Sequence, residues 1–121
     1  MLESGENYLE TILLLQRENG AVRSIDVAQR LAVTKASVSR AMSILEKEEY
    51  LLFSQGGKLV LTEKGRLKAE SILERHEVLT RFLITALGVS RETAALDACR
   101  FEHDISAETF QKVKEFLQKQ A

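Results

Sequence analysis

The sequence contains no proline and one cysteine among its 121 residues. Without proline, and without any tract rich in glycine or serine, no segment resembles a linker, a repeat or a low-complexity region. Because Cys99 is the only cysteine, an intrachain disulfide is excluded. Its thiol must therefore pack in a core, react, or bind a metal.

The sequence also lacks a long apolar run. No stretch approaches the roughly 18 uninterrupted apolar residues that a membrane span requires. The N-terminus carries Glu3 and Glu6 where a secretion signal would carry basic residues. We therefore expect a cytoplasmic protein. An apolar content of 45% suits a globular chain of one modest domain or two small ones.

The sequence also lacks a strong excess of positive or negative charge. A net charge of −1 and a pI near 6.1 argue against a protein whose whole surface binds polyanions. Any contact with nucleic acid must use a local patch. Between positions 23 and 40, four cations accompany a single acid, Asp26, and these cations are Arg23, Arg30, Lys35 and Arg40.

Hydrophobic spacing and capping residues predict a mainly α-helical fold with one small β-hairpin. The expected elements are a helix over 6–18, a short helix capped by Ser24, a helix from Lys35 to about Glu49 capped by Thr34, strands over 50–53 and 58–61, a long helix from Thr62 to Gly88, a helix begun by Ser90 that runs through His103, and a helix begun by Ser106. Gly65, near the start of the long helix, suggests close packing against a neighbour.

A helix, a turn, a second helix and a glycine-tipped hairpin, in that order, are typical of a winged helix-turn-helix. Hydroxyl groups and cations on the early face of the second helix can reach phosphates and base edges in a major groove. The alternative is that these are ordinary solvent-facing side chains. The candidate DNA-binding residues are Arg23, Thr34, Lys35, Ser37, Ser39, Arg40 and Lys58.

Six potential metal ligands occur in three sets, which are Asn7 with Glu10, His76 alone, and Cys99 with Glu102 and His103. Spacings of three and four residues bring side chains onto one face of a helix. A thiolate, a carboxylate and an imidazole suit Fe²⁺, Mn²⁺, Co²⁺ or Zn²⁺. The alternatives are a packed cysteine, a hydrogen-bonded histidine and a solvated Glu10.

The chain resembles the diphtheria-toxin-repressor and manganese-transport-regulator family of metal-dependent transcriptional repressors. The matching segments are Glu6-Asn7-Tyr8-Leu9-Glu10, Ala28-Gln29-Arg30-Leu31-Ala32-Val33 with Ser37-Val38, Leu61-Thr62-Glu63-Lys64-Gly65, Glu74-Arg75-His76-Glu77, and Asp97-Ala98-Cys99-Arg100-Phe101-Glu102-His103. The last is the most specific, because many regulators share a helix-turn-helix.

The resemblance implies that His76, Cys99, Glu102 and His103 are metal ligands, and that Glu10 matches a carboxylate ligand of the manganese-sensing branch. Asn7 stands where the family usually has Asp or Met, and Cys99 resembles the iron-sensing branch. Thr80 and Ala95 stand where iron-sensing members have ancillary Glu and His ligands. The sequence ends after the sixth expected helix, which predicts a short form without the family's SH3-like domain.

These observations predict a winged helix-turn-helix DNA-binding domain at 1–65 and a helical dimerisation and metal-binding domain at 66–121. The hypothesis is a homodimeric repressor that binds operator DNA when Mn²⁺ or Fe²⁺ bridges the two domains, with Co²⁺, Ni²⁺ or Zn²⁺ as substitutes. Phe110, Val113, Phe116 and Leu117 form either the dimer interface or an intrachain core. The competing hypotheses are a regulator that senses redox state or an organic ligand, and a small metalloenzyme, for which no acid, base or nucleophile cluster is evident.

Overall fold

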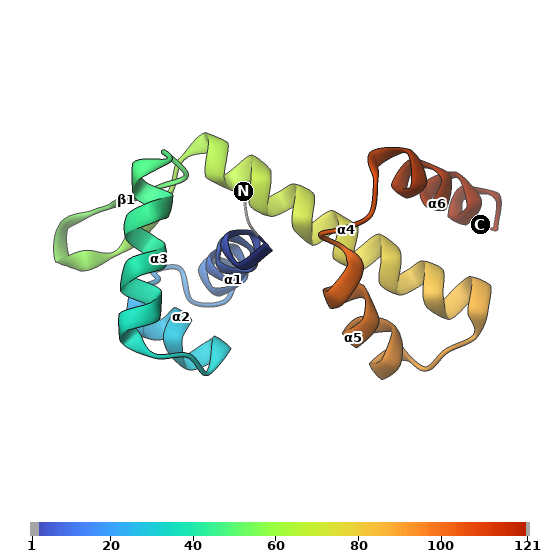
Figure 1. Cartoon of the computed structure of the whole chain (residues 1–121), viewed down its shortest axis with the longest axis horizontal. Coiled ribbons are helices and arrows are strands. Elements are labelled where there is room, and N and C mark those ends of the chain that lie inside the picture. The colour runs from blue at the N-terminus through green and yellow to red at the C-terminus, as the bar shows by residue number, and fades with distance from the viewer. Residues whose placement is uncertain (1–2, 121) are drawn as a thin grey trace. The chain divides into compact units, whose positions relative to one another are not determined.

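The computed structural model describes residues 3–120, which form six α-helices, a short 3₁₀ turn and a two-stranded hairpin (Figure 1). In chain order these are α1 (Glu3–Asn19), α2 (Ser24–Leu31), α3 (Lys35–Lys47), β1 (Leu51–Phe53), η1 (Gln55–Gly57), β2 (Leu59–Leu61), α4 (Glu63–Leu87), α5 (Arg91–Phe101) and α6 (Ala107–Lys119). The chain divides into two compact units, Met1–Glu70 and Ser71–Ala121. The predicted mainly α-helical winged helix-turn-helix is confirmed.

The N-terminal unit is built on buried apolar side chains of α1, α2 and α3, among them Ile12, Val27 and Met42. The backbone N–H of Ser37 donates to the Thr34 hydroxyl, so Thr34 caps α3 as its sequence position predicts. The hairpin pairs Leu51 with Leu61 and Phe53 with Leu59 in antiparallel register. These elements together form a helix-turn-helix followed by a wing.

Gly65 lies in the first turn of α4, directly beside the backbone carbonyl of Tyr50. A Cβ atom at this position would overlap the Tyr50 carbonyl oxygen, which belongs to backbone and cannot swing away. The expected close packing is confirmed. Thr62 caps the start of α4, because its hydroxyl accepts a hydrogen bond from the Gly65 N–H.

The C-terminal unit packs α4, α5 and α6 around Leu79, Ala98, Val113 and Leu117. Ser90 and Ser106 cap α5 and α6, as the sequence predicts. Val113 and Leu117 are buried in this core, whereas Phe116 on the same helix is 37% exposed. The four apolar residues of α6 therefore divide between an intrachain core and a surface.

Two details of the expected helices are wrong. Ser24 is the first residue of α2 and not its cap, because the cap is Arg23, whose N–H donates to the Asp26 carboxylate at 2.8 Å. The fifth helix ends at Phe101, so Glu102 is its C-cap and His103 lies in the following turn. Within residues 3–120, no helix is both long and apolar enough to cross a membrane.

Candidate metal centre and nucleic-acid interface

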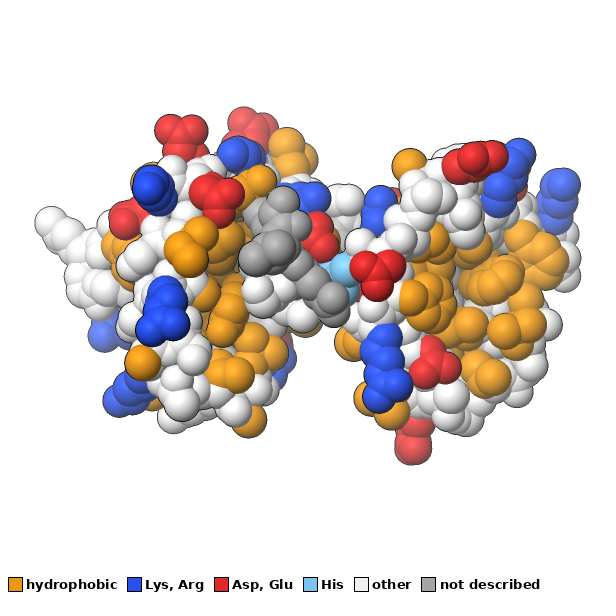
Figure 2. Space-filling model, in the orientation of Figure 1, with side chains coloured by type: hydrophobic (Ala, Val, Ile, Leu, Met, Phe, Trp, Pro, Cys, Tyr) orange, Lys and Arg blue, Asp and Glu red, His pale blue; other side chains and the backbone are white. Residues whose placement is uncertain are grey.

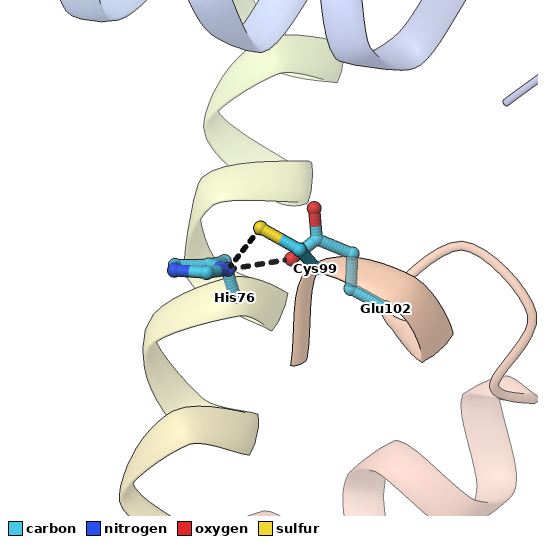
Figure 3. A group of neighbouring side chains, drawn as sticks. All are labelled: His76, Cys99 and Glu102. Carbon is cyan, nitrogen blue, oxygen red and sulfur yellow. Dashed lines mark hydrogen bonds and ion pairs between the residues drawn. The ribbon is translucent and has the colours of Figure 1, made fainter. Parts of the chain in front are cut away.

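Three side chains of the C-terminal unit converge on one point (Figure 3). His76 projects from α4, Cys99 from the last turn of α5, and Glu102 from the C-cap position directly after α5. The His76 Nδ1 atom lies 2.9 Å from Glu102 Oε2 and 3.7 Å from Cys99 Sγ. One nitrogen atom of His76 thus faces both a carboxylate and a thiol.

Glu102 lies between the two histidines of the chain. Its Oε2 contacts His76, and its Oε1 lies 3.3 Å from Nε2 of His103. The Glu102 side chain is completely buried, and its Oε1 is the one buried side-chain polar atom in residues 3–120 that makes no hydrogen bond. Such an atom carries a desolvation penalty, which a bound cation would offset.

The end of α5 holds Glu102 in place. The N–H of Glu102 still donates to Ala98, so helical geometry continues far enough to bring Glu102 beside Cys99. The turn then closes through hydrogen bonds from the N–H groups of Asp104 and Ile105 to the carbonyl of Phe101. Cys99 and Glu102 therefore share a face even though Glu102 follows the last helical residue.

The arrangement fits a first-row transition metal. Bonds of about 2.0–2.3 Å to oxygen, nitrogen and sulfur allow two ligands of one ion to lie up to about 4.5 Å apart. The three ligand atoms of His76, Cys99 and Glu102 all lie within 4.8 Å of one another, a limit a few tenths of an ångström above this separation. The donor set is chemically suitable, and the side-chain exposure of His76, at 24%, leaves a route for an ion.

The remaining predicted ligands are placed differently. His103 contacts the second oxygen of Glu102, and its side chain is 2% exposed. Asn7 and Glu10 lie on α1 in the N-terminal unit, where both are half-buried. Their part in a metal site stays a prediction.

The predicted DNA-reading side chains lie at the N-terminal end of α3. Lys35, Ser37, Ser39 and Arg40 are all exposed there. The hydroxyl of Thr34 accepts from Ser37 N–H and donates to the Ser37 hydroxyl at 2.9 Å. Thr34 therefore first serves the helix as its cap, and the other side chains are available for contacts.

The other two predicted DNA-binding cations meet at the wing. The backbone of Arg23 bridges to Lys58 in an antiparallel pair, and Leu59 N–H donates to Val22 O at 2.7 Å. The Arg23 guanidinium lies 3.6 Å from the position that a Cβ on Gly56 would take. The segment before α2 thus adds a third strand-like edge to the wing and places two cations near its tip.

Sequence reasoning missed one residue beside the candidate metal centre. Arg75 donates from Nη1 to the carbonyl oxygens of Glu102 and Ile105, each at 3.2 Å. No local pattern indicates this role, because the acceptors lie 27 and 30 positions further along the chain. Its position directly before His76 was the only signal in the sequence.

A winged helix-turn-helix together with a helical unit that gathers metal-binding side chains defines a metal-responsive DNA-binding regulator. Residues 1–57 match the family described as "Iron dependent repressor, N-terminal DNA binding domain". Residues 62–120 match "Iron dependent repressor, metal binding and dimerisation domain". The chain belongs to the iron-dependent repressor family, which confirms the resemblance found in the sequence.

Similar proteins agree with this assignment. The chain is 36% identical over 115 residues to the transcriptional regulator MntR of Geobacillus kaustophilus, covering 95% of this chain and 81% of MntR. It is 32% identical over 120 residues to an HTH-type transcriptional regulator of Methanocaldococcus jannaschii, covering 98% and 96%. Both relatives are transcriptional regulators by name.

Solved structures share the fold. IdeR of T. acidophilum superposes with a TM-score of 0.84 at 26% identity, over 93% of this chain and 53% of IdeR. The regulator MtsR gives a TM-score of 0.88 at 20% identity, over 98% of this chain and 55% of MtsR. The chain spans about half the length of these solved relatives. The family is one of metal-dependent transcriptional regulators, so the regulator hypothesis holds and the enzyme hypothesis does not.

Proposed function

We propose that this chain represses transcription in the cytoplasm by binding operator DNA as a homodimer when Mn²⁺ or Fe²⁺ occupies a site made by His76, Cys99, Glu102 and His103. The observation that carries the proposal is the buried Glu102 carboxylate. Its Oε2 lies 2.9 Å from Nδ1 of His76, which also faces the Cys99 thiol, and its Oε1 makes no hydrogen bond and lies 3.3 Å from Nε2 of His103. A buried carboxylate with an oxygen that accepts no hydrogen bond is costly, and a bound cation would offset that cost.

The ligand set leaves two physiological metals in competition. A thiolate favours Fe²⁺, and carboxylate oxygens suit Mn²⁺. Relatives include MntR and a manganese-dependent repressor solved with manganese, and the family description names iron. We propose that either ion activates the protein, and that Co²⁺, Ni²⁺ or Zn²⁺ can substitute in vitro.

The prediction that Asn7 and Glu10 add ligands can be tested by Glu10→Gln.

We propose that α3 enters the major groove of operator DNA and that the wing contacts the adjacent sugar–phosphate backbone. The exposed side chains Ser37, Ser39 and Arg40 are short or extended polar groups that suit base edges and phosphates. Arg23 and Lys58 at the wing suit phosphates or the minor groove, where they would supply charge and not sequence discrimination. A chain of net charge −1 needs this concentration of cations to bind DNA at all.

The C-terminal unit supplies the surface that would join two copies. Leu87 and Leu96 are 65% and 66% exposed, and Phe116 contacts Phe82 edge-on at 5.5 Å while remaining partly open. Figure 2 shows hydrophobic side chains gathered over the right-hand part of the view, which is this unit. Exposed apolar side chains gathered on one unit favour association with a second copy.

Metal would control DNA affinity through linkage. If the metal-bound form presents two α3 helices at the roughly 34 Å spacing of successive major grooves, metal raises operator affinity and operator raises metal affinity by the same factor. A coupling of about 1–3 kcal/mol changes operator affinity about 5–150-fold. That range is sufficient for a transcriptional switch.

The test begins with selecting duplexes from a random-sequence DNA pool under anaerobic conditions, with Mn²⁺, with Fe²⁺ and with EDTA. Fluorescence anisotropy then measures the affinity of the protein for a labelled selected duplex as each ion is titrated. We expect an affinity increase of about 5–150-fold with Mn²⁺ or Fe²⁺, and its loss in Glu102→Gln. Equal binding in EDTA would overturn metal control, and failure to enrich any duplex would overturn the DNA-binding function.

A further inference from the structure

We infer that Arg75 is a positioning residue of the metal centre, which sets where Glu102 and His103 present their side chains without itself touching the metal. The inference rests on the proposed metal site. The proposed ligands are held in two different ways. His76 and Cys99 project from regular helix, whereas Glu102 caps α5 and His103 follows it.

Residues beyond a helix end need another source of order. The last carbonyl groups of a helix lack partners within that helix. Arg75 supplies one, because its Nη1 donates to the carbonyl oxygens of both Glu102 and Ile105. The two acceptors lie at the two ends of the turn between α5 and α6, so a single guanidinium group fixes both ends of the segment that carries the ligands.

The charge of Arg75 adds to this geometry. A cation at the C-terminus of a helix interacts favourably with the negative end of the helix dipole. Hydrogen bonds from a charged donor are also stronger than those between neutral groups. Arg75 is half-buried, which reduces screening by solvent.

The guanidinium group is itself held from a third side. Its central carbon lies 5.6 Å from the centre of the Phe110 ring on α6, and Phe110 packs against the core of the unit. Arg75 therefore connects α4, the ligand-bearing turn and α6. Side chains that orient metal ligands in this way typically change metal affinity about 10–100-fold when they are removed.

Lys114 offers a matched control. Its Nζ lies 5.5 Å from the centre of the same Phe110 ring and 3.6 Å from Glu74, so it is a second cation on that ring. No contact of Lys114 with the turn over residues 102–105 is found in the described part of the chain. Lys114→Met therefore removes a cation from Phe110 and leaves the turn bonded to Arg75.

The test measures metal binding directly, without DNA. Free Mn²⁺ is followed by its electron paramagnetic resonance signal during titration of the wild type, Arg75→Met, Arg75→Lys, Lys114→Met and Glu102→Gln. We expect Arg75→Met to weaken Mn²⁺ binding about 10–100-fold and Arg75→Lys to lie between it and the wild type, since an amine keeps the charge but not the geometry. Lys114→Met should bind as the wild type does.

A spectroscopic readout separates positioning from general loss of structure. At saturating Co²⁺, Arg75→Met should keep the thiolate-to-cobalt absorption band from Cys99, which is held by α5, and should alter the d–d bands that report the other ligands. Thermal unfolding of the metal-free variant shows whether it is folded. If Arg75→Met does not fold, the same comparison is made on Arg75→Lys.

The outcomes are distinct. If Glu102→Gln loses Mn²⁺ binding and Arg75→Met binds Mn²⁺ as well as the wild type does, the positioning role is wrong and the proposed metal site stands. The same conclusion follows if Lys114→Met loses as much affinity as Arg75→Met. If the wild type binds neither Mn²⁺ nor Co²⁺, or if Glu102→Gln binds them as well as the wild type does, the proposed metal site itself is wrong.

Discussion

The substitution Glu102→Gln separates the effect of metal from the effect of folding. Glutamine keeps the volume of the buried side chain, and its carbonyl oxygen can still accept a hydrogen bond from Nδ1 of His76, which lies 2.9 Å from Oε2 in the wild type. The negative charge is lost. We therefore expect the free energy of unfolding of the metal-free variant to lie within about 1 kcal/mol of that of the wild type.

The metal-dependent difference should be much larger. A ligand that binds only the folded state stabilises that state by about 2.7 kcal/mol when its concentration is about 100 times its dissociation constant. For a chain of 121 residues the unfolding entropy corresponds to about 4 °C per kcal/mol. Saturating Mn²⁺ should thus raise the melting temperature of the wild type by about 10 °C, and that of Glu102→Gln by little.

Differential scanning calorimetry with and without Mn²⁺, under anaerobic conditions, measures both quantities. Glu92→Gln is the matched control, because it removes the same charge from an exposed side chain on α5. The control should keep the full metal-dependent increase. An equal increase in Glu102→Gln would refute the assignment of this carboxylate as a ligand.

Three further substitutions test the fold and the DNA surface. Gly65→Ala should lower the free energy of unfolding by about 1–3 kcal/mol, because the added Cβ meets the backbone carbonyl of Tyr50 and this outweighs the helix propensity of alanine; a urea midpoint equal to that of the wild type would contradict the packing. Arg40→Ala should weaken binding to a selected duplex by about 1–3 kcal/mol and relax its preference at one base pair, while metal affinity without DNA stays unchanged. Lys58→Ala should weaken binding to all duplexes similarly and reduce the slope of log affinity against log salt by about 1, and an unchanged slope would remove Lys58 from the DNA interface.

Local sequence signals predicted the helices well because their causes are local. Thr34, Ser90 and Ser106 each accept a hydrogen bond from an N–H group three residues later, so the cap and its partner lie within one turn of sequence. Gly65 was recognisable as a close contact because nothing in its own helix requires glycine. The contacting residue, Tyr50, could not be identified, since it lies on the other side of the hairpin.

The start of α2 shows where local signals fail. Ser24 has the better capping side chain by residue type, yet Arg23 takes the cap position. The bridge from Arg23 to Lys58 and the bond from Leu59 to Val22 hold this segment in extended geometry beside the wing. The pairing partner is more than 30 positions away, so the helix begins one residue from where its own sequence indicates.

The candidate metal centre follows the same division. The spacing of Cys99 and Glu102 predicted that their side chains share a face, and the last turn of α5 provides that geometry. The spacing could not show that the helix stops between them. The turn that follows is bonded to Arg75, which donates from α4 to the carbonyl oxygens of Glu102 and Ile105. The types of the candidate ligands are thus recognisable from short spacings, but their positions depend on contacts between helices.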